Sequence, residues 1–443
     1  MERTFPEHQS LPEPNPKALS IMIVAGEASG DRHGAALARA LKRLNPEIKY
    51  DLFGSGGEEM RAAEVETLVD AREVGIIGVP EIARAIGKLY RAYRTLLDAA
   101  RTRRPSAIVL IDWPDFNMRL ARKLHRDGFK VIYYISPQVW AWRKYRIRAL
   151  RRDVDRMLVI LPFEEEFYRR AGLDVQYVGH PLAEAVRITS SREDFCRRHG
   201  LDPARPIVSL LPGSRHKEIH YHLPAMLDAA VRLRTNRLGI ADCGLRIENR
   251  PAESADPQSA IRNPQSAAPQ SIVPQFVVPL ASTVRRADVM AAIQQAQLAA
   301  IERGESDGLS ITVVEGDTYN ALGHSEIAVV ASGTATVEAA LAGTPMVIIY
   351  RGSELNWRLI RPLIHLDTFG MVNLIAGRRI VPELIQHGVT GASIAREVEA
   401  ILSDTSRLDR MRSDLEQVRE KLEAGGDSGA ERAARAVVQA INE

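Results

Sequence analysis

The sequence has very little cysteine and no long hydrophobic run. Its two cysteines among 443 residues, Cys196 and Cys243, lie far apart and show no metal-ligand spacing. This arrangement gives no disulfide framework and fits a reducing compartment. No apolar run approaches the roughly 20 residues that a membrane-spanning helix needs. The composition therefore predicts a soluble or peripheral globular protein.

A strong net charge is also missing, since 59 basic residues nearly balance 56 acidic ones and leave a formal charge of +3. The global charge therefore gives no reason to expect a nucleic acid partner. Basic residues are dense between Glu81 and Arg104, and again between Arg143 and Arg156. Such runs usually form solvated helix faces, and contact with a membrane or with phosphate is the alternative.

Two segments lack the periodicity of helices and strands. Residues 1–18 are polar and proline-rich without the apolar core of a signal peptide, so they are predicted to be a disordered tail. Residues 240–272 contain a Pro-Gln-Ser unit that recurs at Pro257, Pro264 and Pro269. Recurrent proline without apolar periodicity predicts a disordered insertion.

Short apolar runs alternate with helical patterns along the rest of the chain, in two series separated by a polar stretch. This alternation predicts an α/β protein whose parallel sheets are covered by helices on both faces. We expect two doubly wound domains, residues 19–185 and 200–400, with a cleft between them. Helices over 401–443 are expected to pack back on an N-terminal domain. In such sheets, ligands bind outside the carboxyl ends of the strands.

Two predicted strand-to-helix loops of the first half carry acids. In "AGEASGDRHG" the glycines do not match the dinucleotide fingerprint, and Glu27 and Asp31 would repel a pyrophosphate. A sugar or acceptor contact is one interpretation, and a helix capped by Ser29 or Asp31 is the other. In "VLIDWPDFN" a buried strand ends on Asp112 and Asp115. Either these acids serve the turn, or one of them removes a proton from a substrate.

The second half has two turns of small residues that suit an anion. In "LLPGSRHKE", Gly213 allows close approach of the backbone, Ser214 can donate a hydrogen bond and Arg215 can bind phosphate. The alternative is a helix cap beside a surface arginine. In "VVASGTATVE", a tight turn enters a helix, and Glu338 lies one turn later, where it can reach ribose hydroxyls or simply favour the helix dipole. The turn consists of Ser332, Gly333 and Thr334.

An amphipathic segment lies between residues 76 and 93. Its apolar residues either face the core of the protein or form a membrane-surface patch with a basic rim. The candidate membrane contacts are Ile76, Ile77, Val79, Ile82, Ile86, Leu89 and Tyr90, with Arg84, Lys88 and Arg91 as the rim.

These motifs, in this order, resemble the lipid-A-disaccharide synthase family. The resemblance rests on "VAGEASGD", "IDWPDFN", "YYISPQVWAWR", "LPFEEEFY", "VGHPL", "LLPGSR", "ASGTATVE" and "VNLIAGRRIVPELIQ". It extends from about Ser20 to the C-terminus and omits the Pro-Gln-Ser insertion. It implies a GT-B glycosyltransferase with two Rossmann-like domains. One departure is Trp113, which stands where other members carry a small residue and is expected to narrow that turn.

The resemblance also implies a reaction. Members join UDP-2,3-diacylglucosamine to 2,3-diacylglucosamine 1-phosphate (lipid X), release UDP and invert the anomeric carbon, with no metal or cofactor expected. Asp112 matches the base for the acceptor hydroxyl, and Asp115 and Asn117 its supports, with Asp115 expected to cap a helix that begins near Phe116. Arg215 and Asn373 match residues at the diphosphate and the donor. Residues expected to hold UDP are Gly213, Ser214, Ser332, Gly333, Thr334 and Glu338; Glu27, Ser29 and Asp31 are expected on the acceptor side.

Because both substrates are acylated, the resemblance places the protein in the cytoplasm, on the inner face of the inner membrane of Gram-negative bacteria. It makes the segment between residues 76 and 93 the leading membrane contact, and some members form homodimers with exchanged C-terminal segments. Two alternatives stay open. One is another UDP-sugar transferase, or a UDP-N-acetylglucosamine epimerase, of the same fold. The other is a non-enzymatic peripheral protein that binds lipid A precursors.

Overall fold

The computed structural model describes residues 18–74, 82–141, 144–235, 273–281, 283–302, 304, 310–354, 357–358, 361, 368–423 and 425–443. The predicted tail up to residue 17, the predicted insertion 240–272, and Ile76, Ile77 and Val79 lie outside the described residues. The chain divides into two compact units. Unit 1 runs to Pro181 and includes Leu422–Glu443, and unit 2 comprises Leu182–Lys421.

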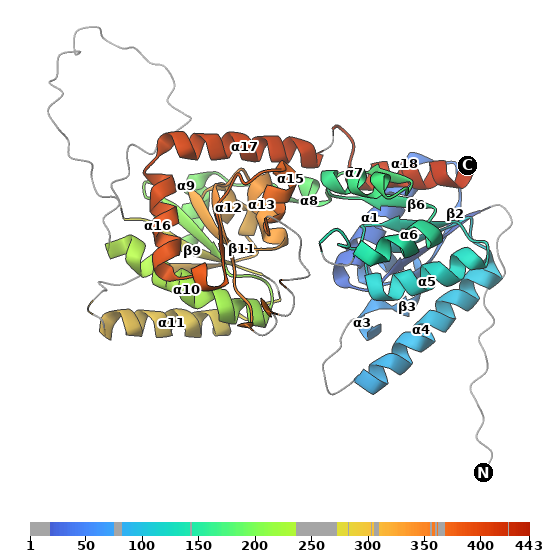
Figure 1. Ribbon diagram of the computed structural model, residues 1–443, viewed down its shortest axis with the longest axis horizontal. Coiled ribbons are helices and arrows are strands. Elements are labelled where there is room, and N and C mark those ends of the chain that lie inside the picture. Colours follow the sequence, from blue (N-terminus) through green and yellow to red (C-terminus); the bar gives the residue numbers. More distant parts are fainter. Residues whose placement is uncertain are drawn as a thin grey trace, which may run out of the picture. The chain divides into compact units, whose positions relative to one another are not determined.

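Within its described residues, unit 1 contains a seven-stranded parallel sheet in the order β3-β2-β1-β4-β5-β6-β7. Figure 1 labels α4, α5 and α6 among the helices of this unit. The strand order reverses between β1 and β4, so their carboxyl ends form the switch point where such sheets bind ligands. The strands are β1 Leu19–Ala25, β2 Tyr50–Gly56, β3 Glu66–Asp70, β4 Ala107–Ile111, β5 Val131–Tyr134, β6 Arg156–Val159 and β7 Val175–Tyr177.

Helices cover both faces of this sheet because alternate strand residues point to opposite sides. Met22 and Val24 belong to one apolar core, which α4, α5 and α6 cover. Ile21 and Ile23 belong to the other, which α1 and α18 cover. The helices of unit 1 are α1 Ala28–Leu44, α2 Glu58–Ala62, α3 Ala71–Val74, α4 Ile82–Arg103, α5 Pro114–Arg126, α6 Ile147–Asp153, α7 Pro162–Arg170 and α18 Gly429–Asn442, with a 3₁₀ turn η2 at Lys144–Arg146.

The described residues of unit 2 contain a six-stranded parallel sheet in the order β10-β9-β8-β11-β12-β13, which reverses between β8 and β11. Its strands are β8 Ile207–Leu211, β9 Gln275–Leu280, β10 Ile311–Glu315, β11 Ile327–Ala331, β12 Met346–Tyr350 and β13 Glu383–Ile385. Its helices are α8 Leu182–Ala185, α9 Arg192–His199, α10 His216–Thr235, α11 Arg286–Glu302, α12 Thr318–Gly323, α13 Thr334–Leu341, α15 Met371–Ala376, α16 Gly391–Leu402 and α17 Thr405–Glu423, with a 3₁₀ turn η4 at Gln386–Gly388.

The C-terminal helices differ from the expectation for residues 401–443. Nearly all of α17 belongs to unit 2, and only α18 packs on unit 1, against α1, β4 and β6. Gly425 adopts a positive φ of 80° between α17 and α18, and Ser428 caps α18 by accepting a hydrogen bond from the Glu431 N–H.

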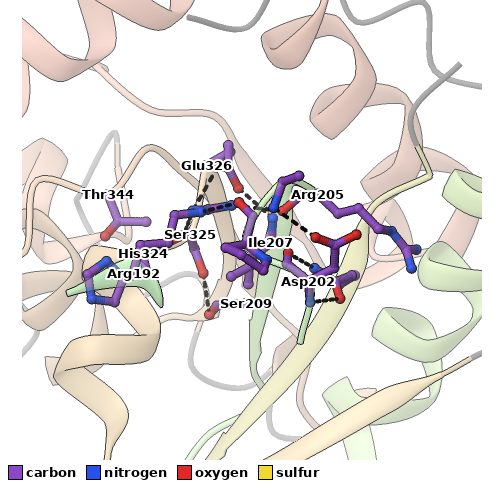
Figure 2. A network of polar contacts seen from close by, with 12 residues as sticks. Arg192, Asp202, Arg205, Ile207, Ser209, His324, Ser325, Glu326 and Thr344 are labelled. Carbon is purple, nitrogen blue, oxygen red and sulfur yellow. Dashed lines mark hydrogen bonds and ion pairs between the residues drawn. The ribbon is translucent and has the colours of Figure 1, made fainter. Parts of the chain in front are cut away.

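A buried polar network joins the amino ends of β8 and β11 in unit 2, as Figure 2 shows. The Glu326 carboxylate accepts a hydrogen bond from the Ile207 N–H and pairs with Arg192 at 3.1 Å. Arg192 also donates to the carbonyls of Pro203 and Arg205, at 2.9 and 2.8 Å. The network lies at the opposite edge of the sheet from the loops expected to bind ligands, so we assign it to the stability of unit 2.

Candidate active site

The turn that carries Asp112 has a strained backbone at the carboxyl end of β4. Asp112 and the next residue, Trp113, adopt φ values of 46° and 48°. Two consecutive left-handed residues cost roughly 1–2 kcal/mol each. Such strain persists only where surrounding contacts impose it, and it is concentrated at functional sites.

Hydrogen bonds from the neighbouring strand and helix hold this turn. The Asp112 carbonyl accepts from the Tyr133 hydroxyl at 2.7 Å and from Asn117 Nδ2 at 2.8 Å. The Asp112 N–H donates to the Tyr134 carbonyl at 3.1 Å. Asn117 therefore supports Asp112 through the main chain and leaves the Asp112 carboxylate available. Tyr133 has the same role, which the sequence did not reveal because a buried tyrosine within an apolar strand looks like ordinary core.

The surroundings of Asp112 favour its protonated form. Burial raises the pKa of the Asp112 carboxyl, and the nearby negative charge of Glu27 raises it further. Glu27 follows β1, the strand next to β4, and precedes α1 with its side chain exposed. A carboxylate with a raised pKa is a stronger base than an exposed one. The two strand ends thus bring together one half-buried and one exposed carboxylate.

Two other acids of unit 1 have structural partners. The Asp31 carboxylate accepts hydrogen bonds from the N–H groups of Gly57, Glu59 and Met60, at 2.6, 3.0 and 3.1 Å. It therefore holds the start of α2 and is not the cap of its own helix, which was the alternative to an acceptor contact. Ser29 likewise lies inside α1, whose N-cap is Glu27 without a side-chain cap bond.

Asp115 is not the N-cap of its helix as expected, because α5 begins at Pro114, two residues before the expected start near Phe116, and its N-cap is Trp113. Asp115 lies in the first turn of α5 and forms an ion pair with Arg146 of η2. The pair ties α5 to the segment that follows the "SPQVWAW" motif. Asp115 thus helps to position α5, the helix that follows the base turn.

Glu164 is a buried acid whose importance the sequence did not reveal. Its Oε1 accepts from the Ser136 hydroxyl at 2.6 Å and from Trp140 Nε1 at 3.0 Å, and its Oε2 accepts from the Leu161 N–H at 3.2 Å. Burial raises the pKa of Glu164 to about 7. Trp140 is itself buried, so its indole packs in the core and anchors the loop after β5. No pattern in the run of three glutamates distinguishes the buried one.

In unit 2, the loop after β8 presents Arg215 to solvent. Gly213 has a φ of 119°, and the N–H groups of Ser214 and Arg215 both donate to Glu218 Oε2, at 2.8 and 3.2 Å. The Arg215 side chain is 82% exposed and contacts Glu218 Oε1 at 3.3 Å. Glu218 lies in the first turn of α10 and caps this helix. It does so by accepting hydrogen bonds from the same N–H groups that were expected to bind a phosphate. Arg215 has room to reach an anionic ligand.

The second turn of unit 2 follows β11. Gly333, with a φ of 151°, is the N-cap of α13, and Thr334 is the exposed first residue of that helix. The Ser332 hydroxyl donates to the Phe369 carbonyl at 3.1 Å. Glu338 lies one turn into α13 and is partly buried. The geometry matches the expected strand–turn–helix, which offers free N–H groups to an anion.

Both polar atoms of the Asn373 side-chain amide form hydrogen bonds within the protein. Its Nδ2 donates to the Val381 carbonyl at 2.9 Å and to Glu383 Oε1 at 2.7 Å, and its Oδ1 accepts from the N–H groups of Ile380 and Val381 at 2.8 and 3.0 Å. An amide offers two donors and two acceptor positions. Asn373 therefore acts on a ligand only through the groups that it holds.

The expected membrane segment is described only in part. On α4, Leu89 packs against the core, whereas Tyr90 is 60% exposed and Lys88 and Arg91 are exposed. The side chains of Ile82, Arg84 and Ile86 lie outside the description. No helix in the described part of the chain is both long and apolar enough to span a bilayer.

Two doubly wound parallel sheets, with polar turns at their carboxyl ends, define the class of the GT-B glycosyltransferases. Solved structures support this class at the level of the fold. A calicheamicin glycosyltransferase covers 96% of this chain and 99% of its own, with a TM-score of 0.54 and 14% identity. A UDP-GlcNAc 2-epimerase from Neisseria meningitidis gives the same coverage and TM-score, with 11% identity.

Sequence comparison identifies the family. Residues 21–241 and 279–438 match the family model for lipid-A-disaccharide synthetase. The lipid-A-disaccharide synthase of Koribacter versatilis is 42% identical over 422 residues, which are 95% of this chain and 98% of that protein. The chain belongs to the lipid-A-disaccharide synthase family, and it is a glycosyltransferase.

Proposed function

We propose that the protein condenses UDP-2,3-diacylglucosamine with lipid X, to give lipid A disaccharide 1-phosphate and UDP with inversion at the anomeric carbon. The observation that carries this proposal is Asp112, a half-buried carboxylate with a raised pKa on a strained turn at the switch point of the unit 1 sheet. Asp112 takes the proton from the 6-hydroxyl of lipid X as the oxygen attacks the anomeric carbon. Glu27 lies on the acceptor side of this reaction.

The donor half of the proposal uses unit 2. The exposed Arg215 guanidinium and the turn at Ser332–Thr334 stabilise the negative charge on the departing UDP. Gly213 and Ser214 let the diphosphate approach the backbone, and this requires the Glu218 carboxylate to give way. Glu338 accepts hydrogen bonds from the ribose hydroxyls. Because both polar atoms of the Asn373 amide are hydrogen-bonded within the protein, we propose that Asn373 positions the Phe369–Gly370 backbone and does not contact the donor.

The test of this function is turnover in mixed micelles. Purified protein receives UDP-2,3-diacylglucosamine and lipid X in the presence of EDTA, and disaccharide and UDP are quantified. Equal amounts of both products support the synthase. UDP without disaccharide means that the acceptor is wrong, and isomerisation of soluble UDP-N-acetylglucosamine means that the chain is an epimerase. Binding of lipid X without turnover points to a non-enzymatic carrier.

The role of Asp112 has its own test in the same assay. Asp112→Asn removes the base while it keeps the size of the side chain, so turnover should fall at least ~100-fold. UDP should still bind, because its proposed contacts lie in unit 2. Turnover at the rate of the unchanged protein would remove Asp112 as the base.

We further propose that unit 1 docks on the inner face of the inner membrane. The helices α4, α5 and α6 cover one face of the sheet, and exposed tyrosines on this side, Tyr90 and Tyr145, accompany cations that have no ion pair among the described residues. These cations are Lys88, Arg91, Arg119, Arg122, Arg126, Arg148 and Arg151. This basic face suits anionic lipid head groups, each cation contributing about 1 kcal/mol.

Vesicle sedimentation tests the docking. Binding should require anionic lipid and should weaken as salt rises, whereas equal binding to zwitterionic vesicles would contradict a charge-driven contact. We also propose a homodimer in which α18 occupies the same groove of a partner chain. Light scattering of the full chain measures that state, and a strictly monomeric mass at micromolar concentration would rule it out.

A further inference from the structure

The Trp113 side chain contacts both loops that carry the candidate acids of unit 1. Its indole stacks on the Phe116 ring of α5, with ring centroids 3.9 Å apart and an interplanar angle of 11°. The same indole lies against Gly26, so closely that a Cβ atom on that residue would overlap its ring atoms. Gly26 directly precedes Glu27, and Trp113 directly follows Asp112. One aromatic ring therefore joins the end of β1 to the end of β4.

The hydrogen bonds that hold the Asp112 turn do not by themselves fix the Asp112 carboxylate on the side of β1. Tyr133 and Asn117 hold the Asp112 carbonyl from β5 and α5, but among the described residues they form no hydrogen bond to the carboxylate itself. The left-handed conformation of Trp113 places its bulky side chain at a position that usually favours glycine. A turn of this shape does not require an aromatic residue, so the indole contact needs a separate explanation.

We propose that Trp113 is a positioning residue, whose indole between Gly26 and Phe116 fixes the Asp112 carboxyl relative to Glu27 and keeps water away from it. This inference rests on the proposed role of Asp112 as the base. It explains why the loop after β1 has no side chain at residue 26. It also assigns a purpose to the residue that departs from the expected family pattern.

The proposal predicts an electrostatic signature. The titratable and charged groups around the turn are Glu27 after β1, Tyr133 on β5, and the Asp115–Arg146 ion pair. Burial is the main cause that raises the pKa of Asp112, and the charge of Glu27 adds to it. Removal of the indole admits water and frees the turn, so the pKa of Asp112 should fall toward its ordinary value. The acidic limb of the pH profile should then move to lower pH.

The experiment measures kcat/KM against pH for the unchanged protein, Trp113→Phe and Trp113→Ala in mixed micelles. For Trp113→Ala we expect the acidic limb at lower pH and a kcat reduced about 10- to 100-fold, the size of effect that misplacement by about 1 Å produces. Trp113→Phe keeps an aromatic stack and should retain the limb near its original pH. UDP affinity, measured by calorimetry, should be unchanged. A lower melting temperature with an unmoved limb would overturn the proposal, because it would show a structural role only.

A second pair of variants keeps the proposal testable even if Trp113→Ala folds poorly. Gly26→Ala should reproduce the loss of kcat, since its methyl group displaces the indole. In Gly26→Ala/Trp113→Ala that overlap is gone, so the double variant should be no worse than Trp113→Ala alone, and additive losses would contradict the contact. Asp112→Asn separates the two hypotheses. If that variant keeps full turnover, the proposed base is wrong; if it is inactive while Trp113→Ala keeps the original profile, only the positioning role is wrong.

Discussion

Asn373 and Glu383 share a hydrogen bond of 2.7 Å, and Glu383 in turn accepts from the N–H groups of Phe369 and Gly370, both at 2.9 Å. The Phe369 carbonyl then accepts from the Ser332 hydroxyl. A buried amide is thereby connected to the turn proposed to bind UDP. The connection passes through a carboxylate on β13, a strand that sequence patterns did not reveal.

Replacement of Asn373 should therefore affect both stability and donor binding. Asn373→Ala leaves the buried N–H groups of Ile380 and Val381 without partners, and each such group costs about 1–3 kcal/mol. We expect a free energy of unfolding lower by about 2–4 kcal/mol and a weaker affinity for UDP, measured by denaturation and calorimetry. Asn45→Ala is the control, because the Asn45 amide makes one contact of 3.5 Å in unit 1. A direct catalytic role would instead lower kcat with UDP affinity and stability intact.

The two interpretations of Asp31 give opposite results. Its carboxylate accepts three backbone hydrogen bonds at the start of α2, so Asp31→Asn turns an amide N–H toward those donors. We expect a loss of about 1–3 kcal/mol in the free energy of unfolding. Thermal denaturation measures this loss, and KM for lipid X is measured in parallel. A raised KM at unchanged stability would establish the acceptor contact instead.

Removal of Arg192 should destabilise unit 2 more than removal of the whole ion pair. Arg192→Met leaves the buried Glu326 carboxylate without its counter-charge, which costs about 3–5 kcal/mol. Arg192→Met combined with Glu326→Gln should recover part of that loss, as judged by chemical denaturation. If the double variant were as unstable as the sum of the single ones, the pair would not be coupled. Arg197→Met, at an exposed ion pair on the same helix, is the control.

Glu164 should make stability depend on pH in an unusual direction. Its pKa is raised from 4.5 to about 7 in the folded protein, so between these values the folded state holds a proton that the unfolded state has released. Its contribution to the free energy of unfolding therefore falls as pH rises from 4.5 to 7, by roughly 3 kcal/mol at most. Glu164→Gln removes this group from the titration.

The measurement is the difference in unfolding free energy between the unchanged protein and Glu164→Gln at several pH values. Subtraction is needed because His33 and His180 act in the opposite direction. Burial lowers the pKa of each histidine to about 4, so the contribution of each to the free energy of unfolding decreases as pH falls below 6.5. A difference that is independent of pH would show that Glu164 does not titrate in this window. Glu166→Gln, which removes an exposed carboxylate from the same helix, is the control.

The core strands of both units were predictable because a strand in the middle of a parallel sheet is buried on both faces and forms an apolar run. The strands β3, β7 and β13 lie at sheet edges and are largely half-buried, and they form no comparable apolar run. An edge strand has one neighbour and keeps polar residues, as "ETLVD" shows, so its pattern is weak.

The candidate site followed a similar rule. Asp112, Arg215 and the Ser332 turn were predictable as polar residues directly after apolar strands. Other contacts were not predictable, because they join distant parts of the chain: Tyr133 reaches Asp112 from the next strand, and Gly57 reaches Asp31 across 26 positions. Side chains such as Asp31 and Asn373 look available in a sequence, and only the fold shows that the backbone already uses them.

The return of α18 to unit 1 has a consequence for synthesis on the ribosome. Ala433 and Val437 form one apolar core with Ile21 and Ile23, although more than 400 positions separate them. Unit 1 is translated first, but its core is complete only when α18 has been synthesised. Unit 2, in contrast, can fold earlier. Truncation of α18 would therefore expose the apolar core beside β1 in unit 1. Proteases and chaperones that act on a truncated chain would meet exposed apolar residues first in unit 1, which carries the proposed base.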